Sequence, residues 1–139
     1  MKPYPWRCGT CRERGVAPET LATYSAEVEH DGHIYSLELA DLPVLRCGHC
    51  GTIILGDDAN AAVSDGLRTA AGILRPDQIR RRRDEAGLTR GELAALMQVS
   101  EATLGRWEDG DQIQGRAMDR FLHAVLDVPE LRRYLQTNT

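Results

Sequence analysis

The chain has 139 residues, enough for one ordinary domain or two very small ones. Hydrophobic residues make up 42% and charged residues 27%, which excludes a disordered chain, and no apolar run approaches the length that crosses a bilayer. The opening residues, MKPYPWRCGTC, lack the apolar core of a signal peptide, so we expect a cytoplasmic protein whose thiols stay mostly reduced.

The net charge of −4 is unevenly distributed along the chain. Residues 1–60 carry five Lys and Arg side chains against nine Asp and Glu, whereas residues 61–139 carry twelve of each. An acidic surface attracts basic partners and repels nucleic acid. We therefore expect the N-terminal part to suit a basic protein partner.

All four cysteines occur in two C-x2-C pairs. The first pair is Cys8 and Cys11, and the second, after a gap of 35 residues, is Cys47 and Cys50. Each pair supplies two thiolates from one tight turn, and a tetrahedral zinc site needs four such donors. The pattern predicts one structural Zn²⁺ bound by all four cysteines.

The gap between the pairs has the alternating pattern of a β-hairpin. Residues 22–30 supply one strand and residues 33–47 the return strand. Asp31-Gly32 between them is a favoured hairpin turn. The hairpin brings the second cysteine pair back to the first, as in a zinc ribbon. A domain of this size buries little core, so it needs a metal to hold it together.

Other roles for the cysteines have less support. A thiol oxidoreductase needs one C-x-x-C beside a βαβ pattern, which we do not find, and two disulfides need an oxidising compartment. Four cysteines also close the coordination shell that a catalytic zinc leaves open. The sequence shows no Ser-His-Asp set or phosphate loop, so we do not expect an enzyme. His30, His33 and His49 are alternative ligands that we expect to be surface or turn residues.

The sequence changes character after residue 58. We expect a zinc-binding β-hairpin domain over residues 1–58 and a helix-turn-helix and dimerisation domain over residues 75–139. The linker between them, 59–74, is small, polar and Ala-rich. This composition suits a short helix, which Gly66 and Gly72 would weaken.

Five helices are predicted in the C-terminal domain. The first covers residues 76–85. Thr89 and Glu92 form a T-x-x-E capping box for the second, and Ser100 caps the third. The apolar periodicity places the other two helices at residues 115–127 and 129–136.

The second and third helices, within LTRGELAALMQVSEATLGRWEDG (88–110), are joined by a tight turn. Two short helices so joined form the DNA-binding helix-turn-helix, whose second helix enters the major groove. Arg106 can pair bidentately with guanine, and Arg90 is well placed for a phosphate. A helical bundle that binds nothing shows the same capping pattern, so that alternative stays open. The residues expected to face the bases are Ser100, Glu101, Ala102, Thr103 and Arg106.

A run of four arginines, Arg80–Arg83, lies on the first of these helices. Four consecutive residues cover all sides of a helix, so they cannot all face DNA. We expect a mainly solvated face, with one or two side chains available to phosphate and others paired with Asp77, Asp84 or Glu85.

Residues 88–110 resemble the XRE-type, lambda-repressor-like helix-turn-helix. The matching positions include Ala94 and the aromatic–Glu pair Trp107-Glu108. Gln98 stands where that family has glycine, so we expect a strained or differently shaped turn there.

The whole chain is similar to the MqsA family of antitoxins, which join a YgiT-type zinc finger to this helix-turn-helix. The similarity rests on the four cysteines, on LRPDQIRRRRDEAGLT and on RWEDG. It implies a type II antitoxin whose zinc domain masks an mRNA-cleaving toxin and whose helical domain dimerises and represses the operon. Arg106 matches a base-contacting arginine of the family and Arg68 is nearest to a linker arginine that touches DNA. Ala102 replaces an asparagine, so the operator sequence is not carried over.

The sequence thus predicts an α+β chain, with a small zinc-ribbon-like β domain followed by an all-α lambda-repressor-like helix-turn-helix bundle. We expect a homodimer, formed by the last two helices, that binds palindromic operator DNA, represses its own operon and holds an RNase toxin, without membrane association. The alternative is a zinc-containing XRE-type transcriptional regulator with no toxin partner.

Overall fold

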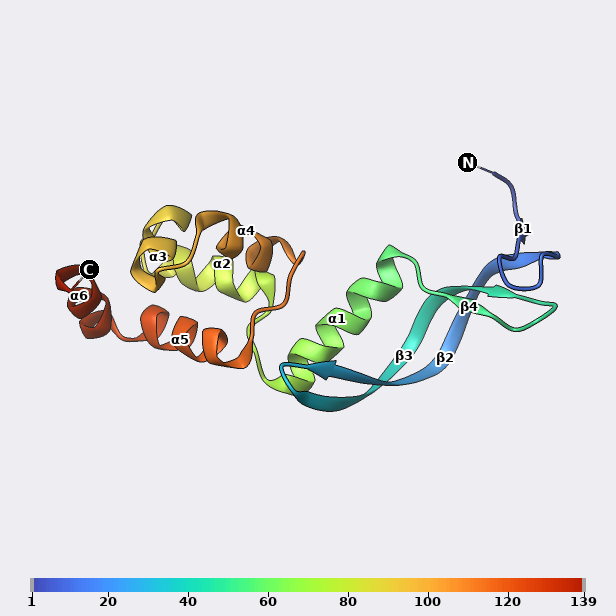
Figure 1. The fold of residues 1–139 in the computed structure, drawn as a ribbon, viewed down its shortest axis with the longest axis horizontal. Helices are drawn as coiled ribbons and strands as arrows, with labels where there is room; N and C mark the ends of the chain where they lie inside the picture. Colours follow the sequence, from blue (N-terminus) through green and yellow to red (C-terminus); the bar gives the residue numbers. More distant parts are fainter. Residues whose placement is uncertain (1, 139) are drawn as a thin grey trace. The chain divides into compact units, whose positions relative to one another are not determined.

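The computed structural model describes residues 2–138 and confirms the α+β class (Figure 1). The residues form two compact units. The first contains the chain up to Val28 and Ile34–Leu67, and the second contains Glu29–His33 and the chain from Arg68 onward. None of the helices described combines the length and apolarity needed to cross a membrane. In chain order the elements are β1 (Trp6–Arg7), β2 (Arg14–His30), β3 (His33–Cys47), β4 (Ile53–Ile54), α1 (Asp57–Ala71), α2 (Pro76–Glu85), α3 (Arg90–Met97), α4 (Glu101–Asp109), α5 (Arg116–Asp127) and α6 (Pro129–Thr137).

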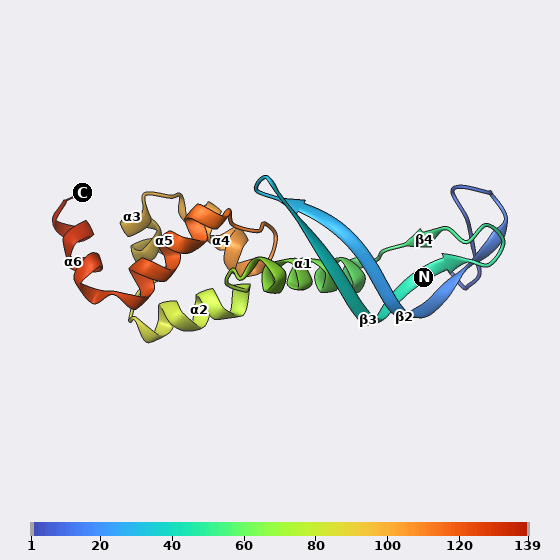
Figure 2. The same cartoon turned by 90° about the horizontal axis from the view of Figure 1, so that it is seen from below.

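A four-stranded sheet in the order β1-β2-β3-β4 forms the zinc-ribbon-like part. Figure 2 shows β2 and β3 as a long twisted hairpin. Asp31 and Gly32 have φ of 53° and 79° at its turn, so the predicted hairpin turn is confirmed. Strand β2 begins at Arg14 rather than at residue 22, because the exposed segment around Pro18 hides its alternation in the sequence. The two-residue strands β1 and β4 are too short to show a period.

The hairpin buries its inner face against α1. Along β3 the inward positions change from Leu37 and Leu39 to Leu42 and Val44. Asp41, with φ of 53°, lies at the change, as expected where one extra residue enters a strand. Helix α1 occupies most of the predicted linker and packs here. The cluster consists of the buried Leu42, Val44 and Ala59 with Leu21, Tyr24, Leu39, Leu55 and Ala62 around them.

Gly66 lets α1 approach the sheet. A Cβ at this position would lie 3.0 Å from Cδ2 of Leu39, which is a very tight contact. The sequence suggests only that Gly66 weakens a helix, because a close approach between distant segments leaves no local signal.

Helices α2–α6 surround a separate core. The predicted caps are confirmed: the Thr89 hydroxyl accepts a hydrogen bond from the Glu92 amide at 3.1 Å, and the Ser100 hydroxyl accepts one from the Thr103 amide at 3.0 Å. The backbone N–H of Thr89 also lowers the pKa of Glu92. The buried core residues are Leu74, Ile79, Leu93, Ala94, Leu96, Met97, Leu104, Trp107, Leu122, Val125 and Leu126.

The turn between α3 and α4 contains a residue in the left-handed conformation. Gln98 has φ of 58° and ψ of 38°, and its side-chain amide donates to the carbonyl of Ala95 at 3.1 Å. A side chain in this conformation costs roughly 1 kcal/mol, whereas glycine adopts it freely. The strained turn expected from the sequence is therefore present.

Gln98→Gly should raise the free energy of unfolding of the helical unit by about 0.5–1 kcal/mol, because it relieves the left-handed strain. Urea unfolding followed by helical circular dichroism measures the change. The control is Gln98→Ala, which keeps the strain and loses the side-chain hydrogen bond to the Ala95 carbonyl. A glycine variant no more stable than the alanine variant would show that the turn is unstrained.

Candidate metal centre and nucleic-acid interface

The four cysteine sulfurs converge on one point. All four Sγ atoms lie within 4.8 Å of one another, with 3.6 Å between Cys8 and Cys50 and 3.6 Å between Cys11 and Cys47. A disulfide bond is about 2.05 Å long, and the four thiols are free. Thiolates around a tetrahedral ion with metal–sulfur bonds of about 2.3 Å lie about 3.8 Å apart. The cluster therefore fits a four-coordinate metal ion.

The two cysteine turns repeat one backbone geometry. The Arg12 amide donates to the Cys8 carbonyl, and the Gly51 amide donates to the Cys47 carbonyl, both at 2.9 Å. Arg12 and Gly51 occupy the same place, directly after the second cysteine of each pair, and both have positive φ, 67° and 77°. Each C-x2-C pair thus turns its two side chains towards the common centre.

The cysteine thiols differ in acidity. The backbone N–H of Cys11, with another amide of the same turn, lowers the pKa of Cys8 to about 6. The Thr52 hydroxyl lowers the pKa of Cys50. The Glu13 amide lowers the pKa of Cys11, but burial and the three neighbouring sulfurs outweigh it and raise that pKa to about 12. Four charged thiolates this close repel one another, so a bound cation would favour full deprotonation.

Gly15 completes the centre and is missed by the sequence analysis. A Cβ here would lie 2.5 Å from Cδ2 of His49 and 3.2 Å from Sγ of Cys47. The Gly15 carbonyl also accepts a hydrogen bond from the Gly48 amide at 2.9 Å. A larger residue would displace the His49 ring and press against the sulfur of Cys47. The sequence signal that could have identified Gly15 is its place within a strand, because a glycine there often marks a close backbone approach.

The three histidines considered as ligands lie outside the cysteine cluster in residues 2–138. The His30 ring contacts the carbonyl of Gln114 at 2.9 Å, and the His33 ring accepts a hydrogen bond from the Arg116 guanidinium. The His49 ring lies against Gly15. The donor set in this part of the chain is therefore four sulfurs.

Helix α4 carries the residues expected to face the bases. Arg106 is exposed, and its guanidinium donates to the Thr103 hydroxyl and to the Gln112 side-chain oxygen, both at 3.2 Å. Gln112 was not predicted, although a polar residue just beyond a helix end can extend a recognition surface. The predicted residues in or flanking the first two turns of α4 are all exposed or half-buried: Ser100, Glu101, Ala102, Thr103 and Arg106.

Arg90 is tied to α4. Its side chain lies over Gly105 and forms ion pairs with Glu108 at 3.6 Å and with Asp109 at 3.5 Å. The side chain remains 35% exposed, so the predicted phosphate contact is compatible with its position.

Arg68, the other predicted DNA contact, is only 3% exposed. Its guanidinium would have to leave this buried position to reach DNA. The position of Arg68 therefore lends no support to the contact that the family resemblance implies.

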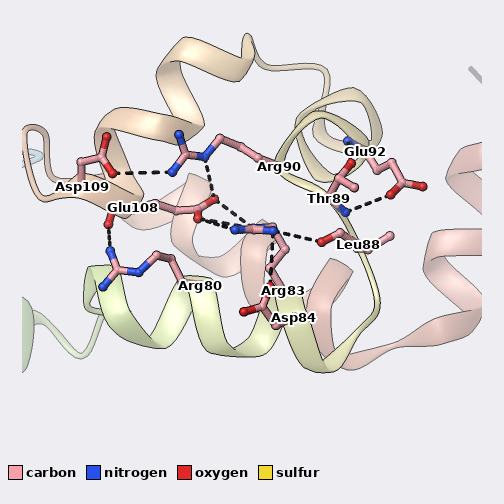
Figure 3. A network of polar contacts seen from close by, with 9 residues as sticks. All are labelled: Arg80, Arg83, Asp84, Leu88, Thr89, Arg90, Glu92, Glu108 and Asp109. Atoms are coloured by element: carbon pink, nitrogen blue, oxygen red, sulfur yellow. Dashed lines mark hydrogen bonds and ion pairs between the residues drawn. The ribbon is translucent and has the colours of Figure 1, made fainter.

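A buried carboxylate joins α4 to the helices before it (Figure 3). Glu108 is 0% exposed, and Arg83 binds it with two nitrogens, at 2.9 Å to Oε1 and 3.2 Å to Oε2. Arg83 also donates to the Leu88 carbonyl at 3.1 Å, and Arg80 donates to the Glu108 carbonyl. These contacts, with Arg90 from α3, fix the helix that carries Arg106.

The arginine run is therefore more than a solvated face. The side chain of Arg83 is 15% exposed, and Arg82 reaches α5, where it contacts His123 at 3.1 Å and Asp127 at 3.4 Å. The expected pairing with a neighbouring acid is present, since Arg83 lies 3.5 Å from Asp84, but the expectation of a mainly solvated run is wrong for Arg83, because its other partner, Glu108, is buried by the fold.

Comparison with known proteins agrees with this geometry. A family model described as a helix-turn-helix domain matches residues 77–135, which span α2 to α6. A search of curated proteins found no match. Residues 77–135 thus match a helix-turn-helix domain, which supports a DNA-binding role for this part of the chain.

Proposed function

We propose that this protein is the antitoxin of a type II toxin–antitoxin pair, which binds its own operator as a homodimer and represses transcription. The observation that carries the proposal is that one chain combines a DNA-binding type of domain with a metal-binding type of domain. One is a helix-turn-helix with an exposed, hydrogen-bonded Arg106, and the other is a separate unit with a four-cysteine cluster.

The DNA-binding step depends on α4. Arg106 is positioned before DNA arrives, because Thr103 and Gln112 already accept its hydrogen bonds. In the major groove these bonds would be exchanged for guanine O6 and N7. Glu101 and Ala102 are exposed beside it, and a bound dimer would block the promoter.

The homodimer is supported by apolar groups left exposed at the C-terminal helices. Val128 is 41% exposed and Tyr134 is 61% exposed. A second copy on this surface would bury them and would place two copies of α4 in successive major grooves.

The metal that suits four thiolates in a tetrahedral arrangement is zinc. Cys8, Cys11, Cys47 and Cys50 would hold it with no open position, so its role is structural. The toxin would bind the first unit, and the acidic balance of residues 1–60 favours a basic partner.

Arg106→Ala should weaken specific binding to the upstream promoter by about 1–3 kcal/mol, because it removes the bidentate contact to guanine. Fluorescence anisotropy with promoter and scrambled duplexes measures the difference. Arg46→Ala is the matched control, since it removes the same charge from an exposed position in the first unit, outside α4 and the proposed dimer surface. If Arg106→Ala binds the promoter like the unmodified protein, α4 is not the recognition helix.

A transcriptional regulator without a toxin is the second candidate. The observation that favours it is that the family match begins at residue 77 and leaves the first unit unmatched. Co-expression with the product of the adjacent gene distinguishes the antitoxin from the regulator without a toxin. Co-purification and loss of that product's RNase activity support the antitoxin, whereas promoter binding without any such complex supports the regulator.

A further inference from the structure

The metal-binding end of the first unit is basic, although residues 1–60 are acidic in total. Four of the five basic residues in that part lie between Lys2 and Arg14, where the only acid is Glu13. The acids lie mainly further along the hairpin and at the start of α1. The expectation that the whole N-terminal part repels nucleic acid therefore does not apply to this end.

Three of these four basic residues, Lys2, Arg7 and Arg14, line a cleft of about 650 Å³ together with Pro3 and Trp6. Arg7 and Arg14 are direct partners in the β1–β2 pair. Like charges opposite each other on antiparallel strands destabilise the pair. Within residues 2–138, neither arginine forms an ion pair that would offset this repulsion. An anion held between the two guanidinium groups would offset it.

The basic side chains are not used by the metal centre. Besides one another, the cysteine sulfurs contact backbone amides, among them those of Thr10 at 3.4 Å and of Glu13, and the Thr52 hydroxyl at 3.0 Å. Among the residues described, no lysine or arginine donates to a sulfur. Their positive charge therefore remains available to a ligand in the cleft.

An aromatic pair adjoins the cations. The Trp6 indole N–H donates to the Lys2 carbonyl at 2.8 Å, so its polar group is already satisfied. The Tyr4 ring stacks on Trp6 with centroids 4.6 Å apart and is 43% exposed. Rings beside a row of cations suit a ligand that carries both a flat apolar base and phosphates. An acidic peptide would use the cations but not the rings.

We propose that this cleft binds single-stranded nucleic acid, with phosphates between Arg7 and Arg14 and near Lys2 and with a base against the Trp6–Tyr4 pair. Its volume is in the range of pockets that hold small organic ligands, which suits a short flexible segment. The site is separate from α4 and does not depend on the proposed antitoxin role.

The test uses the full-length protein with labelled oligonucleotides of about eight uridines or eight thymidines. Anisotropy and quenching of Trp6 emission report binding, and Trp6→Phe identifies the Trp6 signal. Three phosphate contacts predict a slope of log affinity against log salt of about −2, so that a four-fold rise in salt weakens binding roughly 20-fold. Tighter binding of uridines assigns the site to RNA, and equal binding assigns it to either nucleic acid.

Arg14→Gln and Arg7→Gln should each reduce that slope by about 0.7. Arg12→Gln is the matched control, because Arg12 is exposed two residues away and does not line the cleft. Metal content and circular dichroism check that each variant is folded.

Three results would overturn the proposal: no binding at low salt, equal losses in the Arg12 and Arg14 variants, or binding lost in Arg106→Ala instead. A poly-glutamate peptide that binds as tightly and depends on the same arginines would assign the cleft to an acidic protein. Duplex promoter binding, measured on the same samples, tests the helix-turn-helix separately.

Discussion

Glu108→Ala should lower the free energy of unfolding of the helical unit by about 3–5 kcal/mol. Glu108 is 0% exposed, and its removal leaves the Arg83 guanidinium, itself only 15% exposed, without its main partner. In the unmodified protein the hydrogen bonds that Arg83 donates to Glu108 raise the pKa of Arg83. Arginine keeps its proton at ordinary pH even without that partner, so in the variant it cannot escape the penalty by losing its charge. Urea unfolding, monitored by helical circular dichroism, measures the loss.

Asp109, the acidic residue next to Glu108, supplies the matched control. The side chain of Asp109 is 56% exposed and pairs with Arg90 at the surface, so Asp109→Ala should change stability by less than about 1 kcal/mol. Arg83→Ala should be about as damaging as Glu108→Ala, and the double variant should lose much less than the sum of the two. Additive losses would show that the two side chains do not act as a pair.

The elements with local signals were predictable from the sequence. The capping box at Thr89, the cap at Ser100 and the turn at Asp31-Gly32 each depend on a few adjacent residues, and the structure has all of them. The convergence of the four sulfurs follows from the spacing of two C-x2-C pairs and a hairpin between them.

Features that depend on contacts between distant segments were not predictable. Glu108 and Arg83 are both charged, so each looks like a surface residue until α2 and α4 are packed together. Gly15 gives no periodic signal, and its role depends on the turn that contains His49. For the same reason the buried position of Arg68 could not be foreseen.

Removing the proposed zinc with a chelator should unfold the hairpin and the cysteine turns and leave α2–α6 folded. The core around Cys8, Cys47 and Val16 is very small, since two of its three buried residues are cysteines, and the other cluster of the hairpin, against α1, also has only three buried residues. Structural zinc contributes about 10–16 kcal/mol of binding free energy, far more than such a core supplies. The helical unit has its own core, so its amide signals should persist in NMR spectra while those of β2 and β3 collapse.

Cys47→Ser should have the same effect as the chelator, because a serine hydroxyl does not ionise at neutral pH and cannot replace a thiolate ligand. Cys47 is 1% exposed, at the end of β3, so loss of its bond to the metal also releases that strand from the cysteine turns. His49→Ala is the control, since His49 lies between the two cysteines of the pair but outside the donor set. Metal analysis should find about one ion per chain in the His49 variant and much less in the Cys47 variant. A Cys47→Ser protein that keeps its metal and the β2–β3 signals would rule out the four-cysteine site.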